Sequence, residues 1–341
     1  MRRMPAEWEP HAATWLAWPH NAEDWPGKFA PIQWVYADII RHLARRERVE
    51  LLVQDAEAEA KARKVLKRAN ALSEGVRFHQ VPTDRIWMRD SGCTFIQEDD
   101  QLRGVQWQFN AWAKYDNWQR DRRVNLSMNH INTFQPLPAL HGEKPVVLEG
   151  GSIDVNGQGV LLTTEECLLS EVQQRNPGFG KADYERVFAE YLGIRKVIWL
   201  DRGIEGDDTH GHVDDITRFV APDTILTVVE PDPSDPNHEP LAENLRRLKA
   251  ERNLDGQPFR IVELPMPSPV FFEGRRLPAS YGNFYIANGL VLVPTFNDPK
   301  DRLALNLLAG LFPDREIVGI HSGDFIWGFG AMHCMTQQQP A

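Results

Sequence analysis

The alternation of short strand-like runs with helical segments is the feature that most constrains how this chain can fold. Runs rich in β-branched and aliphatic residues predict strands at 49–53, 76–81, 146–148, 159–163, 196–200, 216–220, 224–229, 260–264, 290–295 and 316–320. Residue spacing predicts helices at 31–46, 56–71, 181–192, 240–252 and 299–311. Such alternation is typical of an α/β protein, whose sheet could be open, closed or divided. The 341 residues could form one large domain or two.

Charge and cysteine content argue against several classes of protein. The net charge is −10 and no basic block occurs, so we expect no nucleic-acid partner, whereas a cationic ligand is compatible. No glycine-rich nucleotide motif follows a strand. The three cysteines, Cys93, Cys167 and Cys334, are far apart and odd in number, which indicates a reducing compartment rather than a disulfide framework. No apolar run is long enough to span a bilayer, so we expect a cytoplasmic protein with no membrane partner.

Cys334 follows His333 and lies seven residues from the carboxyl end of the chain. A thiolate is well suited to attack a cationic or carbonyl-like carbon near neutral pH. Chain ends fray, so such a nucleophile requires that the tail be held in place. The alternative is that Cys334 is a small buried hydrophobic residue, as free cysteines usually are.

Two carboxylates follow apolar runs and are candidate ligand-binding groups. Asp90 precedes Ser-Gly, where it could bind a ligand or cap an Asx-type turn. Trp87, three residues earlier, could stack on a planar cation or belong to the core. Glu149 directly follows 146–148 and is not expected to be buried without a partner. The paired glycines after Glu149 allow close backbone approach, although a strand end with a simple turn is the alternative.

The segment 206–215 contains the densest cluster of polar side chains in the sequence. His210 and His212, followed by aspartates, resemble part of a metal site, for which only His321 and His333 could complete the ligand shell. We favour acid–base use instead. If residues 212–214 formed a strand, His212 and Asp214 would point to one face and form a pair for proton transfer and cation binding.

Asn283 lies among aromatic residues and is a further site candidate, whereas Asn288 and Gly289 predict a hairpin turn. Together these motifs supply a thiol, an imidazole, three carboxylates and an amide. That set suits the binding of a planar cation between carboxylates while a thiolate attacks its central carbon.

With these residues identified, the chain resembles the agmatine deiminase and Porphyromonas-type peptidylarginine deiminase family, of the guanidino-group-modifying pentein superfamily. The resemblance runs nearly end to end. Its motifs are MPAEWEP (4–10), AWP (17–19) with Trp25, WMRD (87–90), FNAW (109–112), EGGS (149–152), LLTTEECLL (161–169), GHVD (211–214), NFYIANG (283–289), and His333-Cys334 with TQQ (336–338).

The resemblance implies a fold and an activity. It implies that 1–341 is a single α/β domain, a five-bladed pseudosymmetric propeller of ββαβ modules around a central channel. It implies hydrolysis of a guanidino group to a ureido group with release of ammonia, without metal or cofactor. Agmatine, giving N-carbamoylputrescine, is the leading substrate, and a homodimer or homotetramer is expected.

The resemblance also assigns roles to individual residues. Cys334 would be the nucleophile and His212 the general acid and base, while Asp90 and Asp214 would hold the guanidinium nitrogens. Glu149 and Asn283 match pocket positions. The carboxylates should raise the pKa of Cys334 in the empty site, and the bound cation and a protonated His212 should lower it. We therefore expect substrate binding to help generate the thiolate.

The sequence also departs from the family pattern. The usual glycine-rich ending has Phe329, Ala331, Met332 and Met335 substituted into it, and His210 and Asp215 stand where asparagines are usual. Residues 84–86 read Asp-Arg-Ile rather than acidic and serine residues, and Cys93 replaces a proline.

These departures concern the surroundings of the substrate's far end. If Arg85 faces the pocket, it would favour a carboxylate there and disfavour an amine. Alternative functions are a deiminase of free arginine, of C-terminal peptidyl arginine or of another guanidino compound, and a non-catalytic propeller that binds a partner. A metal-dependent hydrolase centred on His210 and His212 is a third alternative.

Overall fold

The computed structural model describes residues 2–99 and 101–341 and has a mixed α/β architecture, as the alternation of segments predicted. The helices are α1 (Phe29–Leu43), α2 (Ala56–Arg68), α3 (Met88–Ser91), α4 (Val124–Ile131), α5 (Glu165–Leu169), α6 (Lys181–Leu192), α7 (His238–Ala250) and α8 (Asp301–Leu311). Short 3-10 helices are η1 (Ala22–Asp24), η2 (Ala111–Ala113), η3 (Asp121–Arg123), η4 (Gly150–Ser152), η5 (Val213–Asp215) and η6 (Phe325–Gly328).

Within the described residues, five sheets have three or more strands. The first sheet has the strand order β1 (Arg2–Arg3), β5 (Thr94–Glu98), β6 (Gln101–Gln106), β7 (Leu137–Pro138), and the second has the order β10 (Asp154–Val155), β11 (Val160–Thr164), β12 (Lys196–Leu200). The third has the order β13 (Thr217–Ala221), β14 (Thr224–Val229), β15 (Arg260–Pro265), and the fourth has the order β18 (Tyr285–Ala287), β19 (Leu290–Thr295), β20 (Glu316–His321). The fifth has the order β21 (Gln337–Pro340), β2 (His11–Ala17), β3 (Arg48–Val53), β4 (Val76–Gln80). Two ribbons, β8 (Leu140–His141) with β9 (Lys144–Pro145) and β16 (Phe271–Phe272) with β17 (Arg275–Arg276), complete the list.

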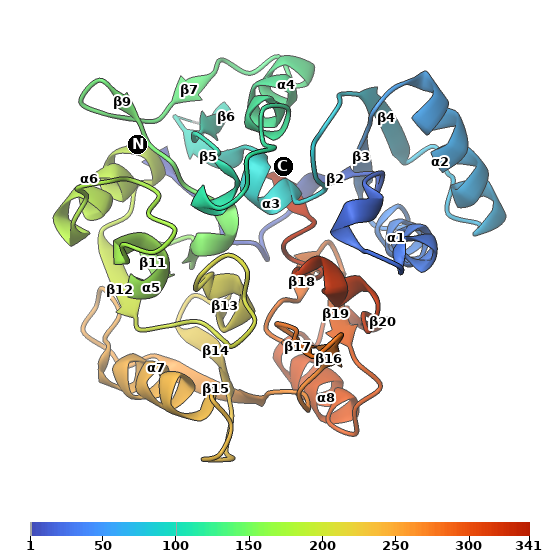
Figure 1. Ribbon diagram of the computed structural model, residues 1–341. Coiled ribbons are helices and arrows are strands. Elements are labelled where there is room, and N and C mark those ends of the chain that lie inside the picture. The colour runs from blue at the N-terminus through green and yellow to red at the C-terminus, as the bar shows by residue number, and fades with distance from the viewer. Residues whose placement is uncertain (1, 100) are drawn as a thin grey trace.

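The five sheets share one local topology. In each, an inner strand pairs antiparallel with one neighbour and parallel with another, as in β13–β14–β15 and β18–β19–β20. The parallel pairs are joined through helices, because a parallel connection must cross back over the sheet. Figure 1 shows the sheets arranged around the centre of the molecule, with α2, α6, α7 and α8 toward the outside. No strand pairing among the described residues joins one of these sheets to the next.

Local sequence explains the helix boundaries. In α1 the buried residues include Ile32, Tyr36, Ile39 and Leu43, which lie on one face of the helix. Helix α2 begins after Asp55, whose side chain accepts a hydrogen bond from the amide of residue 58, and it ends in basic residues that favour the helix dipole. The predicted helices are therefore confirmed, with ends that differ by up to three residues.

Most of the predicted strands are confirmed, with three differences. Residues 146–148 do not form a strand, because the side chain of Asn176 hydrogen-bonds both backbone groups of Val147, which makes only an isolated bridge. Residues 213–215 form η5 rather than a strand. Strand β2 was not predicted, although it pairs with both β3 and β21. The hairpin turn at residues 288–289 is confirmed between β18 and β19.

The carboxyl-terminal tail is built into the fold. Strand β21 pairs antiparallel with β2, and the side chains of its three glutamines are buried. Gln339 accepts a hydrogen bond from Trp15 Nε1 at 2.8 Å, and Gln338 accepts one from Arg89 Nη1 at 2.6 Å. The segment that bears Cys334 is therefore fixed on its carboxyl side.

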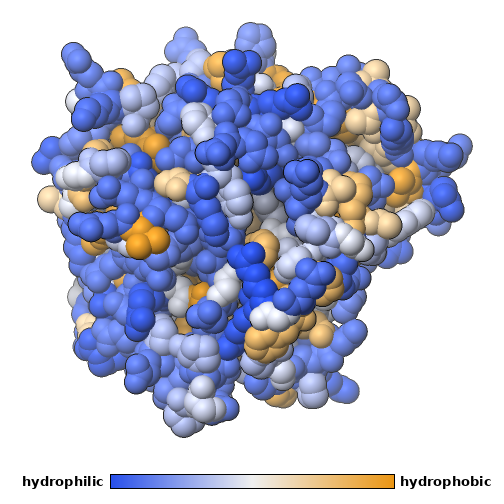
Figure 2. Space-filling view, viewed as in Figure 1, coloured by the Kyte–Doolittle hydropathy of each residue, from blue (hydrophilic) through white to orange (hydrophobic). Residues whose placement is uncertain are grey.

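The surface is mostly hydrophilic on the face seen in Figure 2, where apolar residues lie in small separate groups. Among the described residues, no helix has the length and apolar character needed to cross a bilayer.

Candidate active site

Cys334 lies between η6 and β21, on a turn that is held against the loop before β18. The residue is buried, with 5% of its surface exposed. The side-chain amide of Asn283 donates to Sγ at 3.0 Å, and Sγ lies 3.6 Å from Asp214 Oδ2. Burial, together with the nearby carboxyl groups of Asp214, Asp215 and Asp90, raises the pKa of the Cys334 thiol well above its ordinary value. The thiol therefore carries its proton at neutral pH while no cation is bound.

Asp90 is on α3, the short helix that follows Trp87. Trp112 Nε1 donates to its Oδ2 at 2.9 Å, and the amide of Gly151 donates to its Oδ1 at 3.0 Å. Burial raises the pKa of Asp90 to about 6, and Asp214 and Glu149 add to that effect, whereas His212 opposes it. Its two hydrogen bonds fix the carboxylate at the cavity floor in an orientation that leaves further lone pairs for a ligand.

His212 is fully buried among three carboxylates. Its Nδ1 is 3.9 Å from Asp90 Oδ1 and 4.0 Å from Asp214 Oδ1, and its Nε2 is 3.8 Å from Glu149 Oε2. Neither ring nitrogen is hydrogen-bonded to another described residue. Burial lowers the pKa of His212, but Asp90, Cys167 and Glu149 outweigh it and raise the pKa well above its ordinary value. The protonated imidazole can therefore give a proton to a group placed between these carboxylates.

A capped turn positions His212. The carboxylate of Asp207 accepts from the amides of Gly211 and His212 at 2.7 and 3.1 Å. Gly211 has a φ of 93°, and a Cβ there would lie 2.9 Å from a carboxylate oxygen of Glu166. This turn directs the neighbouring His210 away from the site, where its Nε2 lies 3.2 Å from Ser170 Oγ.

The negative charge of Glu149 is balanced by Arg175, a residue that was not predicted from the sequence. Arg175 Nε lies 3.1 and 3.3 Å from the two carboxylate oxygens of Glu149, and both side chains are fully buried. Burial opposes ionisation, but Arg175 and His212 lower the pKa of Glu149 to about 2. Glu149 is therefore an anion beside His212, and no local signal around residue 175 indicated this pairing.

Gly151 allows the imidazole and the carboxylates to converge. A Cβ at this position would lie 2.5 Å from His212 Nδ1, 3.0 Å from Asp90 Oδ1 and 3.1 Å from Asp214 Oδ2. The close approach to the backbone expected from the paired glycines is therefore confirmed. The groups that approach Gly151 are the side chains of His212, Asp90 and Asp214.

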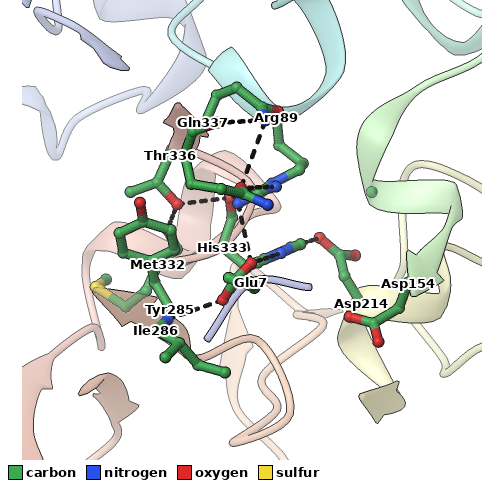
Figure 3. A network of polar contacts seen from close by, with 12 residues as sticks. Glu7, Arg89, Asp154, Asp214, Tyr285, Ile286, Met332, His333, Thr336 and Gln337 are labelled. Carbon is green, nitrogen blue, oxygen red and sulfur yellow. Dashed lines mark hydrogen bonds and ion pairs between the residues drawn. The ribbon is translucent and has the colours of Figure 1, made fainter. Parts of the chain in front are cut away.

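Asp214 is hydrogen-bonded to the residue before Cys334. Figure 3 shows His333 lying between Asp214 and Glu7, with each ring nitrogen 2.7 Å from a carboxylate oxygen. Burial opposes ionisation of Asp214, but the hydrogen bond to His333 and the nearby His212 lower its pKa below the ordinary value. Glu7 in turn accepts from the amide of Ile286 at 2.8 Å. The amino-terminal segment thus supports the orientation of a site carboxylate.

Two arginines balance the charge of Glu7. Arg89 Nη2 lies 3.3 Å from Oε2, and Arg218 Nη2 lies 2.9 Å from Oε1. Burial opposes ionisation, but Arg218, His333 and Arg89 lower the pKa of Glu7 well below its ordinary value. Sequence analysis proposed no role for Glu7 or Arg218.

Asn283 connects the thiol to the second aspartate of the cluster. Its Nδ2 donates to Asp215 Oδ1 at 2.9 Å as well as to Cys334 Sγ, and its Oδ1 accepts from the amide of His333 at 3.0 Å. Burial and the adjacent Asp214 raise the pKa of Asp215 well above its ordinary value. Of the two adjacent aspartates, Asp214 therefore carries the charge and Asp215 the proton.

The histidines of the possible metal site do not converge. Among the described residues, two groups of three place their potential ligand atoms within 4.8 Å of one another: Glu149, Cys167 and His212, and Asp214, Asp215 and Cys334. Neither group contains His210 or His321. His333 has both ring nitrogens next to carboxylates.

Cys334 and Asp90 line a cavity of about 400 Å³ that opens to the surface. Trp87 is a wall residue, and it approaches Gly330 so closely that a Cβ there would lie 2.6 Å from the indole ring. Arg85 also faces the cavity. The other aromatic residues that line the cavity are Trp112, Tyr115, Trp327 and Phe329. A floor with a carboxylate and a thiol under aromatic walls suits a slender organic cation.

The fold and the site define an α/β protein with a buried thiol in a cavity lined by carboxylates and aromatic rings. The family model for Porphyromonas-type peptidyl-arginine deiminase matches residues 3–340, and the chain belongs to this family. It is 37% identical to agmatine deiminase of Pseudomonas aeruginosa (strain LESB58) over 365 aligned residues, which cover 99% of this chain and 95% of the relative.

Two solved structures are similar over the same extent. Agmatine deiminase of Enterococcus faecalis has a TM-score of 0.90 and 32% identity, and covers 99% of this chain and 96% of that one. A cysteine-to-serine variant of C. jejuni agmatine deiminase with substrate bound has a TM-score of 0.88 and 29% identity, and covers 100% of this chain and 97% of that one.

Proposed function

We propose that this protein hydrolyses agmatine to N-carbamoylputrescine and ammonia, as an amidine hydrolase with a cysteine nucleophile. The observation that carries the proposal is the convergence of Cys334, His212, Asp90 and Asp214 at one buried point. Full-length similarity to agmatine deiminases supports the choice of substrate.

The guanidinium is bound by the two aspartates. It is planar and delocalised and presents parallel N–H groups, so carboxylates on either side can each accept a pair of hydrogen bonds. In this proposal Asp90 and Asp214 supply those carboxylates, with His212 close to both, and the guanidino carbon is placed over Sγ of Cys334. Trp87 and Trp112 restrict the substrate chain to a narrow path.

Substrate binding also assists ionisation of the thiol. The negative charges that raise the pKa of Cys334 belong largely to the groups that bind the cation. When the guanidinium is bound, its positive charge offsets them, and the thiolate becomes accessible at neutral pH.

The reaction then has two stages. Thiolate attack forms a C–S bond, His212 gives its proton to a terminal nitrogen, and the C–N bond breaks to release ammonia and leave a thiouronium on Cys334. Water then attacks the same carbon, and His212 takes a proton from that water. The C–S bond breaks, which returns the thiolate, and the remaining hydroxyl group loses its proton to solvent, which leaves the neutral ureido product. Glu149 stabilises the charged imidazole, and Asn283 holds Sγ.

We also propose that 1–341 acts as one domain with five ββαβ modules in propeller arrangement. The shared topology of the five sheets supports this. The homodimer or homotetramer implied by the family resemblance stays a prediction.

The decisive experiment measures ammonia release and product mass for wild type and Cys334→Ala. The substrates are agmatine, free arginine and a peptide with a carboxyl-terminal arginine. Agmatine should gain about one mass unit, because NH is exchanged for O in thiolate-mediated hydrolysis, and the variant should be inactive. Turnover of a different guanidino compound would change the substrate and retain the mechanism. Activity lost to a chelator and restored by a divalent metal would refute the thiol mechanism, and no turnover would favour a binding protein.

A further inference from the structure

The mouth of the cavity contains a carboxylate with an unused oxygen. Asp24, at the end of η1, lines the same cavity as Asp90 and Cys334, and its side chain is 11% exposed. Its Oδ1 accepts from Asn21 Nδ2 at 3.1 Å and lies 3.9 Å from Arg85 Nε. Its Oδ2 is buried and has no hydrogen-bond partner among the described residues. A buried oxygen of this kind is costly unless a ligand satisfies it.

Two other charged residues that line the cavity, Asp208 and Arg85, already have partners. Asp208 accepts from Lys114 and Tyr115, and from Arg275 Nη2 at 3.2 Å. The two Nη atoms of Arg85 donate to the backbone and side-chain oxygens of Asn117 at 2.7 Å each, and its guanidinium stacks 4.5 Å from the Tyr115 ring. Arg85 therefore faces the cavity with one N–H of each Nη atom donated to Asn117.

We propose that Asp24 binds the primary ammonium at the far end of the substrate, while Asp90 and Asp214 hold the guanidinium. This inference rests on the proposed deiminase function and narrows its substrates to ω-guanidinoalkylamines. Burial raises the pKa of Asp24 to about 6, against the opposing effect of Arg85, so the carboxylate is ionised at neutral pH. An ammonium donating to Oδ2 forms a charge-assisted hydrogen bond in a partly desolvated position.

The same arrangement disfavours an α-amino acid at this position. The carboxylate of arginine would be brought toward the Asp24 anion, while each Nη atom of Arg85 already donates one of its two N–H groups to Asn117. Two carboxylates brought close together repel each other, and a substrate carboxylate without a partner in the cavity would lose its hydration without compensation. The presence of Arg85 therefore does not make the mouth a carboxylate site.

The test compares substrates with and without the ammonium in wild type, Asp24→Asn and Glu23→Gln. Glu23 lines the same rim but is exposed, so its substitution is a control that removes one charge from the same segment. The substrates are agmatine and 1-butylguanidine, which ends in a methyl group. For Asp24→Asn, kcat/KM for agmatine should fall about 10- to 100-fold, the usual effect of losing a hydrogen bond between charged groups. With 1-butylguanidine it should change less than about twofold, and Glu23→Gln should lower agmatine turnover less than about threefold.

Equal losses with both substrates would overturn the role of Asp24 in ammonium binding, and so would an unchanged kcat/KM for agmatine. A second measurement does not require the Asp24→Asn variant to fold correctly. In Cys334→Ala protein, calorimetry should show agmatine binding about tenfold or more tightly than 1-butylguanidine, and equal affinities would overturn the inference.

The two proposals fail in different ways. Agmatine that binds Cys334→Ala but is not hydrolysed by wild type would refute the proposed reaction alone, and calorimetry with the Asp24→Asn change would still decide the inference. Hydrolysis of agmatine by wild type without discrimination at Asp24 would refute the inference alone.

Discussion

Replacement of Gly151 by alanine should abolish most activity while leaving the protein folded. Gly151 does not have a positive φ, so the backbone accepts alanine without strain. The added Cβ, however, would lie 2.5 Å from His212 Nδ1, whereas ordinary contact begins at 3.4 Å. Asp90 and Asp214 are also within 3.1 Å of that Cβ, so the imidazole ring cannot move aside without displacing these carboxylates as well.

The size of the effect follows from this overlap. Restoring contact requires the imidazole or the η4 backbone to move about 0.9 Å, the difference between 2.5 and 3.4 Å. A displacement of about 1 Å in a catalytic site costs on the order of 100-fold in rate. Overpacking a buried site costs about 1–3 kcal/mol in stability, which a protein of this size tolerates.

Gly310 provides a matched control. It lies inside α8, and a Cβ there would meet nothing within 4 Å. Gly310→Ala should leave kcat/KM unchanged and increase the free energy of unfolding by about 0.5–1 kcal/mol, because alanine has the higher helix propensity.

The assay is ammonia release from agmatine, with kcat and KM determined at a temperature at which denaturation curves show both variants to be folded. Gly151→Ala should lose about 100-fold in kcat/KM. If it retained more than about a third of wild-type kcat/KM, the tight convergence of His212, Asp90 and Asp214 would not be needed for the reaction, and the reasoning would be refuted.

Two further predictions concern protonation. Because the pKa of Asp90 is raised to about 6, its carboxylate is charged above that pH and neutral below it, so binding of the guanidinium is present at pH 7 and lost as the pH falls through 6. KM for agmatine should therefore rise about tenfold per unit below pH 6, and a KM that stays flat down to pH 5 would contradict this. The second prediction is that iodoacetamide alkylates Cys334 slowly at pH 7 in substrate-free protein, because burial and the surrounding carboxylates raise the pKa of the thiol. Asp214→Asn should accelerate alkylation at the same pH, and a substrate-free thiol already ionised below pH 7 would exclude substrate assistance.

Local sequence signals predicted the elements that have their own periodicity. In α1 and α2 the apolar residues recur at helical spacing on one face and polar residues occupy the other, so this repeat can be recognised from the local sequence alone. Strand β2 lacks such a signal because it is buried on both faces, and its sequence His-Ala-Ala-Thr-Trp-Leu-Ala does not alternate. Conversely, 146–148 has the composition of a strand, but Asn176 takes the backbone groups of Val147.

The candidate site divides in the same way. Residue types in short motifs indicated the thiol, the imidazole, the carboxylates and the amide, since Asp90 and Glu149 follow apolar runs and residues 206–215 form a dense polar cluster. The partners of these groups come from distant segments: Arg175 contacts Glu149, and Glu7 contacts His333, which in turn contacts Asp214. Such pairs depend on how the sheets pack against one another, and the local sequence around residues 7 and 175 does not indicate that packing.

The position of the proposed nucleophile, seven residues from the end of the sequence, places a specific demand on the fold, because the ends of most chains are loosely held. The demand is met on both sides of Cys334. After it, β21 pairs with β2, and Ala341 donates from its amide to the carbonyl of Pro10 at 2.9 Å. Before it, His333 is fixed by Asp214 and Glu7, and Glu7 belongs to the segment that leads into β2. Residues 7–10 and 333–341 therefore lie against each other beside the site, and these contacts also position the thiol against Asp214.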